Sequence, residues 1–283
     1  MMSFLVNWNP FSISAAQLTF MRGFLDSVIL LPFILPSLPQ LKVKRSWLIW
    51  LRSFAGSISL ALFYWNLQRS AVGTATLLSN LAPVFVVMLS RVFLRERLRL
   101  REFVALGIIF ASVLLLQIPN VELTGLTGAT LSLGLTGAFF AGLAYFSLKL
   151  STSSFPALLI IFCFCLTNMP VALLMPSEPW LWPNATQFLF MIAVALSALG
   201  GQIFMTFTYM KLRASVASVL IMTTLGWAVF FSAFFTGRIP SVFECVAYAL
   251  LIFGVYLLNR TTRARMGSDG SKAQIAAQPL IEG

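Results

Sequence analysis

The chain of 283 residues is 59% hydrophobic and only 10% charged, a composition that excludes an ordinary soluble domain. Its net charge of +11 does not indicate a nucleic-acid partner, because the basic residues lie in short tracts between long apolar segments, as in the loops of membrane proteins. Since histidine is absent and the three cysteines form no CxxC pair, the sequence predicts no metal site and no cofactor.

Apolar runs long enough to cross a bilayer follow one another along most of the chain, separated by short segments rich in proline, glycine and asparagine. They predict membrane-spanning helices near 12–35, 46–67, 71–94, 100–118, 125–149, 155–175, 186–210, 214–236 and 240–258. Residues 1–9 are too few to span a membrane and are interpreted as the stub of a truncated first helix. Residues 261–283 lose hydrophobicity and predict a disordered cytoplasmic tail.

Lysine and arginine collect in the loops that follow alternate spans. The basic positions are Lys42, Lys44 and Arg45, then Arg95, Arg97, Arg99 and Arg101, then Lys149, then Lys211 and Arg213, then Arg260, Arg263 and Arg265. The positive-inside rule places these loops and the carboxyl terminus in the cytoplasm. The sequence therefore predicts a multi-pass protein of the plasma membrane, which is the inner membrane in a bacterium, with the lipid bilayer as a partner.

Comparison of the chain with itself reveals a repeat at a shift of 142 residues. Residues 75–116 match residues 217–258 with 11 identities over 42 positions, where composition alone predicts about four. The turn "RERLRLRE" in the first copy carries four arginines, whereas "TGRIPSVFE" in the second carries one. By the charge rule the two copies insert in opposite senses, which is the inverted repeat typical of secondary transporters.

The stretch 67–116 resembles the signature of the drug/metabolite transporter superfamily, specifically its EamA-type branch. The resemblance is carried by the small residues that open a helix at 71–75, by "APVF" at 82–85, by the charged turn with Glu96, and by Arg22 in "ISAAQLTFMRG". In the second half, Arg238 and Leu225 depart from the family pattern. Outside those positions the likeness extends over about residues 11–259.

This resemblance implies an all-α polytopic membrane protein with ten helices in an inverted repeat of two five-helix units. The first repeat would cover residues 1–120, with an incomplete first helix, and the second residues 121–260. The family fold encloses a central cavity that opens alternately to each side, with no ATPase and no enzymatic activity.

The charged residues inside predicted spans are candidates for coupling or for structure. Arg22 and Asp26 are spaced i, i+4, so they share a helix face and can neutralise each other, either as a structural pair or with Asp26 as a proton or substrate site. Glu102 and Glu244 match under the repeat and are predicted to stabilise helix starts, with Glu244 also a candidate for proton coupling. Arg52 is predicted to anchor a helix end at the lipid headgroups.

The polar residues at mid-membrane depth form a candidate substrate cavity. Pro83 predicts a helix kink that frees backbone carbonyls near Ser79 and Asn80, either for packing or for substrate. The repeat mate of this segment offers Thr224 and Trp227. The remaining candidates are Tyr64, Asn66, Tyr145, Asn168 and Gln202, of which Tyr64 and Asn66 also fit an interfacial belt.

Together these features predict a secondary transporter of small organic metabolites, such as amino-acid or drug-like solutes, working by export or exchange through alternating access. The alternatives are uptake or exchange of a nucleotide-like metabolite by the same fold, and a non-transporting channel or scaffold subunit. The small organic solute is the expected partner. Protons or a counter-solute, and a homodimer, are further partners that the sequence leaves open.

Overall fold

In the computed structural model, the described part of the chain comprises residues 11, 13–42, 45–67, 69–70, 72–96, 99–117, 127–175, 180, 182–224 and 242–277. Every regular element in these ranges is helical, which confirms the all-α prediction. The elements are α2 (Ala15–Ile34), η1 (Leu35–Lys42), α3 (Trp47–Leu67), α4 (Val72–Ser79), α5 (Ala82–Phe93), α6 (Leu100–Gln117), α7 (Gly128–Ser151), α8 (Ala157–Leu173), α9 (Ala185–Lys211), α10 (Ala214–Ile221) and α12 (Val242–Ala277).

Five helical stretches in the described part of the chain are long and apolar enough to cross a membrane: Ala15–Leu41, Trp47–Asn66, Thr74–Phe93, Gly128–Ser151 and Ala185–Lys211. Ala157–Leu173 and Val242–Leu258 are shorter apolar helices. Large apolar side chains remain on the outside, among them Phe33, Val92 and Phe204, which are 67%, 69% and 77% exposed. Contact with lipid tails removes such surface from water, so the chain is a multi-pass membrane protein.

Local sequence explains where several helices begin. Ser14 caps α2 by accepting a hydrogen bond from the backbone N–H of Gln17. Thr127 with Thr130, and Asn184 with Gln187, form reciprocal capping boxes at the starts of α7 and α9. These contacts satisfy backbone donors that a helix start leaves unpaired, which is a strong requirement close to lipid.

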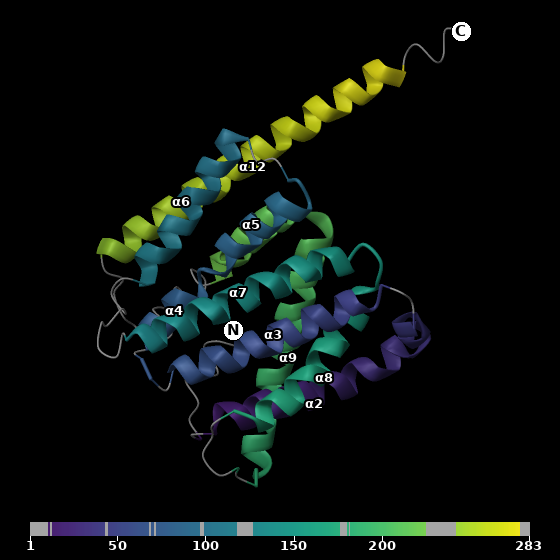
Figure 1. Ribbon diagram of the computed structural model, residues 1–283, viewed down its shortest axis with the longest axis vertical. Coiled ribbons are helices and arrows are strands. Elements are labelled where there is room, and N and C mark those ends of the chain that lie inside the picture. Colours follow the sequence, from purple (N-terminus) through teal and green to yellow (C-terminus); the bar gives the residue numbers. More distant parts are fainter. Residues whose placement is uncertain are drawn as a thin grey trace.

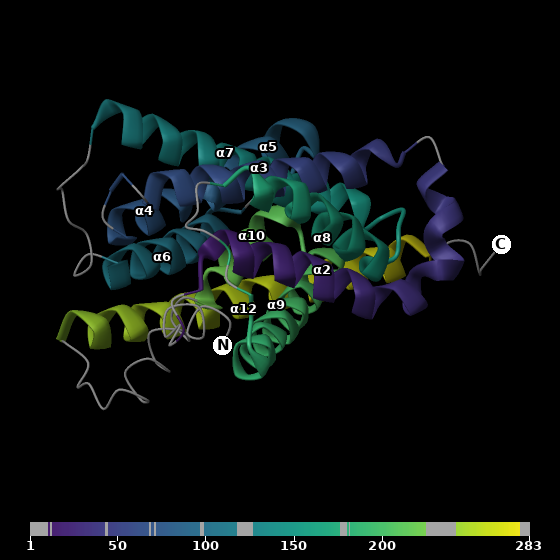
Figure 2. The ribbon, with the colours of Figure 1, turned by 90° about the horizontal axis from the view of Figure 1, so that it is seen from below.

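The shift of 142 residues seen in the sequence also relates the helix starts. Ala157 opens α8 142 residues after Ala15 opens α2, and α10 and α12 follow α4 and α6 by the same interval. Two of these corresponding pairs also pack together, since α2 contacts α8 and α6 contacts α12, while α10 packs against α5. Figure 1 shows α6 and α12 side by side, and Figure 2 shows α3 and α7 adjacent along one side of the molecule.

The division into residues 1–120 and 121–260 stays a prediction, since much of the predicted span 214–236 lies outside the described residues. For the predicted tail, the backbone of α12 stays helical to Ala277, whereas composition predicts a disordered segment from residue 261. Figure 1 shows this end of α12 projecting beyond the other helices. The backbone hydrogen bonds of a helix are made within the segment itself, so α12 can continue past the end of the apolar run.

Glycine allows α7 to pack tightly against the start of α5. A Cβ atom at Gly142 would lie 2.6 Å from the Cβ of Phe85 and 3.0 Å from the backbone oxygen of Ala82. Neither neighbour can be moved by a rotation of a side chain alone. Small residues at such contacts are a general means of bringing membrane helices together.

We therefore expect Gly142→Ala to lower the free energy of unfolding by about 1–3 kcal/mol, the usual cost of overpacking a tight contact. Thermal unfolding of the detergent-purified protein measures this change. Gly201→Ala is the matched control, because nothing lies within 4 Å of the added Cβ atom on α9. Equal stability of the two variants would show that the α5–α7 contact is not close-packed.

Candidate functional site

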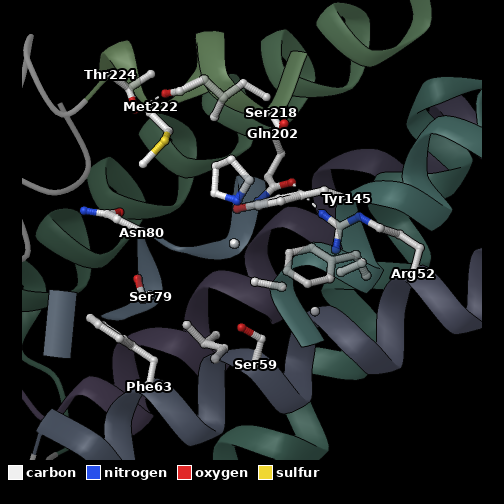
Figure 3. Close-up of a pocket in the computed structure, with 18 of the residues that line it drawn as sticks. Arg52, Ser59, Phe63, Ser79, Asn80, Tyr145, Gln202, Ser218, Met222 and Thr224 are labelled. Atoms are coloured by element: carbon white, nitrogen blue, oxygen red, sulfur yellow. Dashed lines mark hydrogen bonds between the residues drawn. The ribbon is translucent and has the colours of Figure 1, made fainter. Parts of the chain in front are cut away.

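A cavity of about 320 Å³ lies where helices of the first and second halves of the chain meet. Helices α2, α3 and α5 supply one part of its wall, and α7, α8, α9 and α10 supply the other. The predicted cavity residues that line it are Ser79, Asn80, Tyr145, Gln202 and Thr224, together with Pro83 and Arg22. Figure 3 shows Ser79, Asn80 and Thr224 toward one side of this space and Arg52, Gln202 and Tyr145 toward the other.

The cavity wall includes a break in a membrane-spanning segment. Helix α4 ends at Ser79 and α5 begins at Ala82, with Pro83 in its first turn. The backbone N–H of Asn80 still donates to the carbonyl oxygen of Thr76, at 3.0 Å. The side-chain amide nitrogen of Asn80 is buried without a hydrogen-bond partner in the described part of the molecule. The break thus leaves an unused donor on the wall of the cavity.

Arg52 also lines the cavity, where sequence reasoning placed it at the headgroups, and that prediction is wrong. Its side chain is only 3% exposed. The guanidinium carbon lies 4.3 Å from the centroid of the Phe164 ring, and Nη2 lies 3.5 Å from Oε1 of Gln202. Because Arg52 lies near the start of α3, the sequence suggested that its side chain could reach the headgroups. The same face of α3 carries Ile49 and Gly56, however, and this face is turned toward the interior of the protein.

The pair formed by Arg22 and Asp26 exists as predicted from their spacing. Nε of Arg22 lies 3.8 Å from Oδ2 of Asp26, which is fully buried. The thiol of Cys165 lies 3.8 Å from the same oxygen. Gly23 allows this approach of α8, because a Cβ atom there would lie 2.8 Å from the backbone oxygen of Cys165. Arg22 reaches the cavity wall, while Asp26 lies behind it.

The structure places other candidates away from the cavity. Asn168 is buried between α3 and α8, where it accepts a 2.8 Å hydrogen bond from the hydroxyl of Ser57. Asn66 is buried near the end of α3, and its backbone oxygen accepts from the hydroxyl of Ser70. The ring of Tyr64 packs edge-on against Phe63. Glu244 lies in the first turn of α12, and Trp227 lies outside the described residues.

Hydrogen bonds and an ion pair join the first half of the chain to the second beside the start of α10. The carboxylate of Glu96 accepts from the backbone N–H of Ala214 at 3.0 Å, and from the N–H and hydroxyl of Ser215 at 3.4 and 2.5 Å. Nearby, Nη2 of Arg213 lies 2.8 Å from Oε1 of Glu102. Glu102 also accepts from the backbone N–H of Arg99, in agreement with its predicted role at a helix start.

The sequence offered partial signals for these contacts between the halves. Glu96 stood out as the acid of the charged turn, but its partners are about 118 residues away, and pairing over that interval cannot be deduced from local patterns. The carboxylate meets the start of α10, where free backbone donors and the helix dipole favour an anion.

These features define a multi-pass membrane protein whose two halves enclose a cavity of the size of a small metabolite. Residues 1–118 match the model of the EamA-like transporter family, which confirms the resemblance seen in the sequence. Over that region the chain carries the broken span and the arginine that the resemblance pointed to.

Similarity to proteins named as transporters extends this result beyond residue 118. An uncharacterized transporter of Helicobacter pylori is 24% identical over 208 residues, which are 71% of this chain and 69% of that protein. The pseudopaline exporter CntI of Pseudomonas aeruginosa is 21% identical over 267 residues, covering 93% of this chain and 92% of its own. A protein of known crystal structure, 19% identical, shares the fold with a TM-score of 0.72 over 93% of both chains. Fold and relatives together support a membrane transporter of small solutes.

We expect Asp26→Asn to lower the free energy of unfolding by about 1–3 kcal/mol, because the variant leaves Arg22 without its charged partner in a buried position. Counterflow of solute in proteoliposomes should persist, since Asp26 does not line the cavity. Thermal unfolding and radiolabelled counterflow measure the two effects.

Ser37→Ala, at a partly exposed position of the short helix η1 after α2, serves as a control for expression and unfolding. Normal stability with loss of proton-driven flux in the Asp26→Asn variant would contradict the structural role and assign Asp26 to proton coupling.

Proposed function

We propose that the chain is a secondary transporter that exports or exchanges small organic metabolites by alternating access around the cavity. The observation that carries the proposal is the cavity of about 320 Å³ lined from both halves of the chain. Such a site at the interface of two repeats is where secondary transporters bind their substrates. A full-length relative named as an exporter favours outward transport.

The contacts of Glu96 support a conformation closed at one end. Ser215, which they engage, lies one helical turn before Ser218, a residue of the cavity wall. The participating loops carry Arg95 and Arg99 on one side and Lys211 and Arg213 on the other. By the positive-inside rule we assign this end to the cytoplasm, with the carboxyl terminus on the same side.

Alternating access requires that these closing contacts break when the cavity opens to the cytoplasm. The two halves would then move relative to each other about the cavity, with α5 separating from α10. A channel would need no such closure. The geometry therefore favours a carrier over a permanently open pore.

Counterflow in proteoliposomes tests the proposed function directly. Vesicles loaded with an unlabelled solute should accumulate the same labelled solute transiently and with saturation, which is a property of carriers. The screen covers amino acids, nucleosides, nucleotide derivatives, organic acids and cationic drugs, with protein-free vesicles as the control. A conductance that does not saturate, or absence of flux for every solute, would contradict the proposal.

We expect Glu96→Gln to open the cytoplasmic end more often, because a neutral amide is a weaker acceptor for the donors at the start of α10. Loss of one charged hydrogen bond of about 1.5–3 kcal/mol would shift the equilibrium about tenfold or more. Labelling of a cysteine at position 218, in a chain whose three native cysteines are replaced, measures the shift from the cytoplasmic side.

Arg101→Gln is the matched control for this experiment, because Arg101 is an exposed charge in the first turn of α6 outside the closing contacts. An unchanged labelling rate in Glu96→Gln, with Arg101→Gln also unchanged, would show that Glu96 does not hold this end closed.

A further inference from the structure

The charges of the cavity are unbalanced. Two arginines, Arg22 and Arg52, line it, and no carboxylate is among the described residues of its wall. In the described ranges, Arg22 pairs with Asp26 and Arg213 pairs with Glu102, so Arg52 has no carboxylate partner there. The wall therefore presents an uncompensated positive charge to whatever occupies the cavity.

Arg52 is also incompletely hydrogen-bonded. Its Nε is buried and has no acceptor within the described part of the chain. Its contact with Gln202, at 3.5 Å, lies at the long limit for a hydrogen bond. The ring of Phe164 contacts the flat face of the guanidinium. The N–H groups of the guanidinium lie in its plane, so this contact leaves them able to donate to an acceptor.

A second unused donor lies across the cavity. The side-chain nitrogen of Asn80, in the break between α4 and α5, has no hydrogen-bond partner in the described structure. Figure 3 shows Asn80 and Arg52 on different sides of the space, with Tyr145 and Gln202 near Arg52. The unpaired groups of the wall are thus donors.

Apolar side chains complete the lining. Leu60 and Phe63 from α3, Pro83 from α5, and Ile221 and Met222 from the end of α10 supply carbon surface between the polar groups. An inorganic anion would leave this surface without contacts. A solute with an apolar skeleton and an anionic oxygen group satisfies both parts of the wall.

We propose that the cavity binds small organic anions, with Arg52 as the residue that receives their carboxylate or phosphate group. This inference rests on the proposed function and narrows its substrate class from small organic solutes to small organic anions. Planar guanidinium groups bind both carboxylates and phosphates through parallel N–H···O hydrogen bonds, so the shared chemistry is an anionic oxygen group on an organic body. Asn80 would contact a polar group at the other end of the solute.

Ligand-induced thermal stabilisation of the detergent-purified, full-length protein tests the proposal without requiring transport. Succinate, benzoate and glycerol phosphate are each compared with their neutral counterparts succinamide, benzamide and glycerol, at equal ionic strength set with sodium chloride. Inorganic phosphate shows whether the organic body is needed. We expect at least one organic anion to stabilise the protein and its neutral counterpart to have no effect at the same concentration.

Variants then assign the effect to Arg52. Arg52→Gln should weaken binding of that anion by about tenfold or more, Arg52→Lys should retain part of it, and Arg101→Gln should bind as the unmodified chain does. The comparison of anion with neutral counterpart uses the unmodified chain, so the proposal stays testable even if Arg52→Gln folds poorly. Stabilisation by the neutral counterparts alone, stabilisation by no organic anion, or full anion binding by Arg52→Gln would each overturn it.

The counterflow experiment separates failure of this inference from failure of the proposed function. Saturable counterflow of neutral or cationic solutes, with no anion bound, would leave the transporter intact and refute anion selectivity. Binding of an anion through Arg52 without any counterflow would support the binding site and refute transport.

Discussion

A guanidinium buried among apolar helices must be solvated by the protein itself, and Arg52 is the residue on which this requirement falls. Moving such an ion out of water costs several kcal/mol even after the structure relaxes. The ring of Phe164 returns about 2 kcal/mol at most, and the 3.5 Å contact with Gln202 returns little. The cavity of about 320 Å³ beside the guanidinium has room for water or a solute that supplies the remaining hydrogen bonds.

Glycines in the neighbouring helices make room for the buried guanidinium and for close contacts around the cavity. Gly56 lies one turn after Arg52, and the space that its missing side chain leaves is taken up by the guanidinium and by the Phe164 ring. Gly23 and Gly142 bring α8 to α2 and α7 to α5 in a similar way, so that helices on either side of the cavity are held at close range. The cavity is therefore a gap between tightly packed helix pairs, whose positions are set by glycine contacts.

The sequence predicted most of the fold because its strongest signals are one-dimensional. Apolar length located the helices, and the 142-residue shift found between 75–116 and 217–258 also separates the starts of α8, α10 and α12 from those of α2, α4 and α6. Pro83 also predicted the break at Ser79 and Asn80, because proline disrupts a helix regardless of which helix face is turned inward. Depth in the membrane, which follows from position along a span, was sufficient for these features.

Direction around a helix axis was harder to predict, and the site depends on it. Asn168 and Gln202 lie at plausible depths, yet one hydrogen-bonds Ser57 between α3 and α8 while the other reaches the cavity. Arg52 was misplaced for the same reason, because the weak periodicity of uniformly apolar helices does not say which face is inward. The small and polar residues that follow Arg52 on its face, Gly56 and Ser59, were the signal that could have located it.

The attachments of Arg52 come from both halves of the chain, since α3 carries the residue while α8 and α9 carry Phe164 and Gln202. A displacement of the second half against the first would pull the aromatic face and the amide away from the cation together. Affinity for a bound solute would then depend on which side of the membrane the protein faces. A solute bound tightly in one conformation would then dissociate in the other, without a separate step for its release.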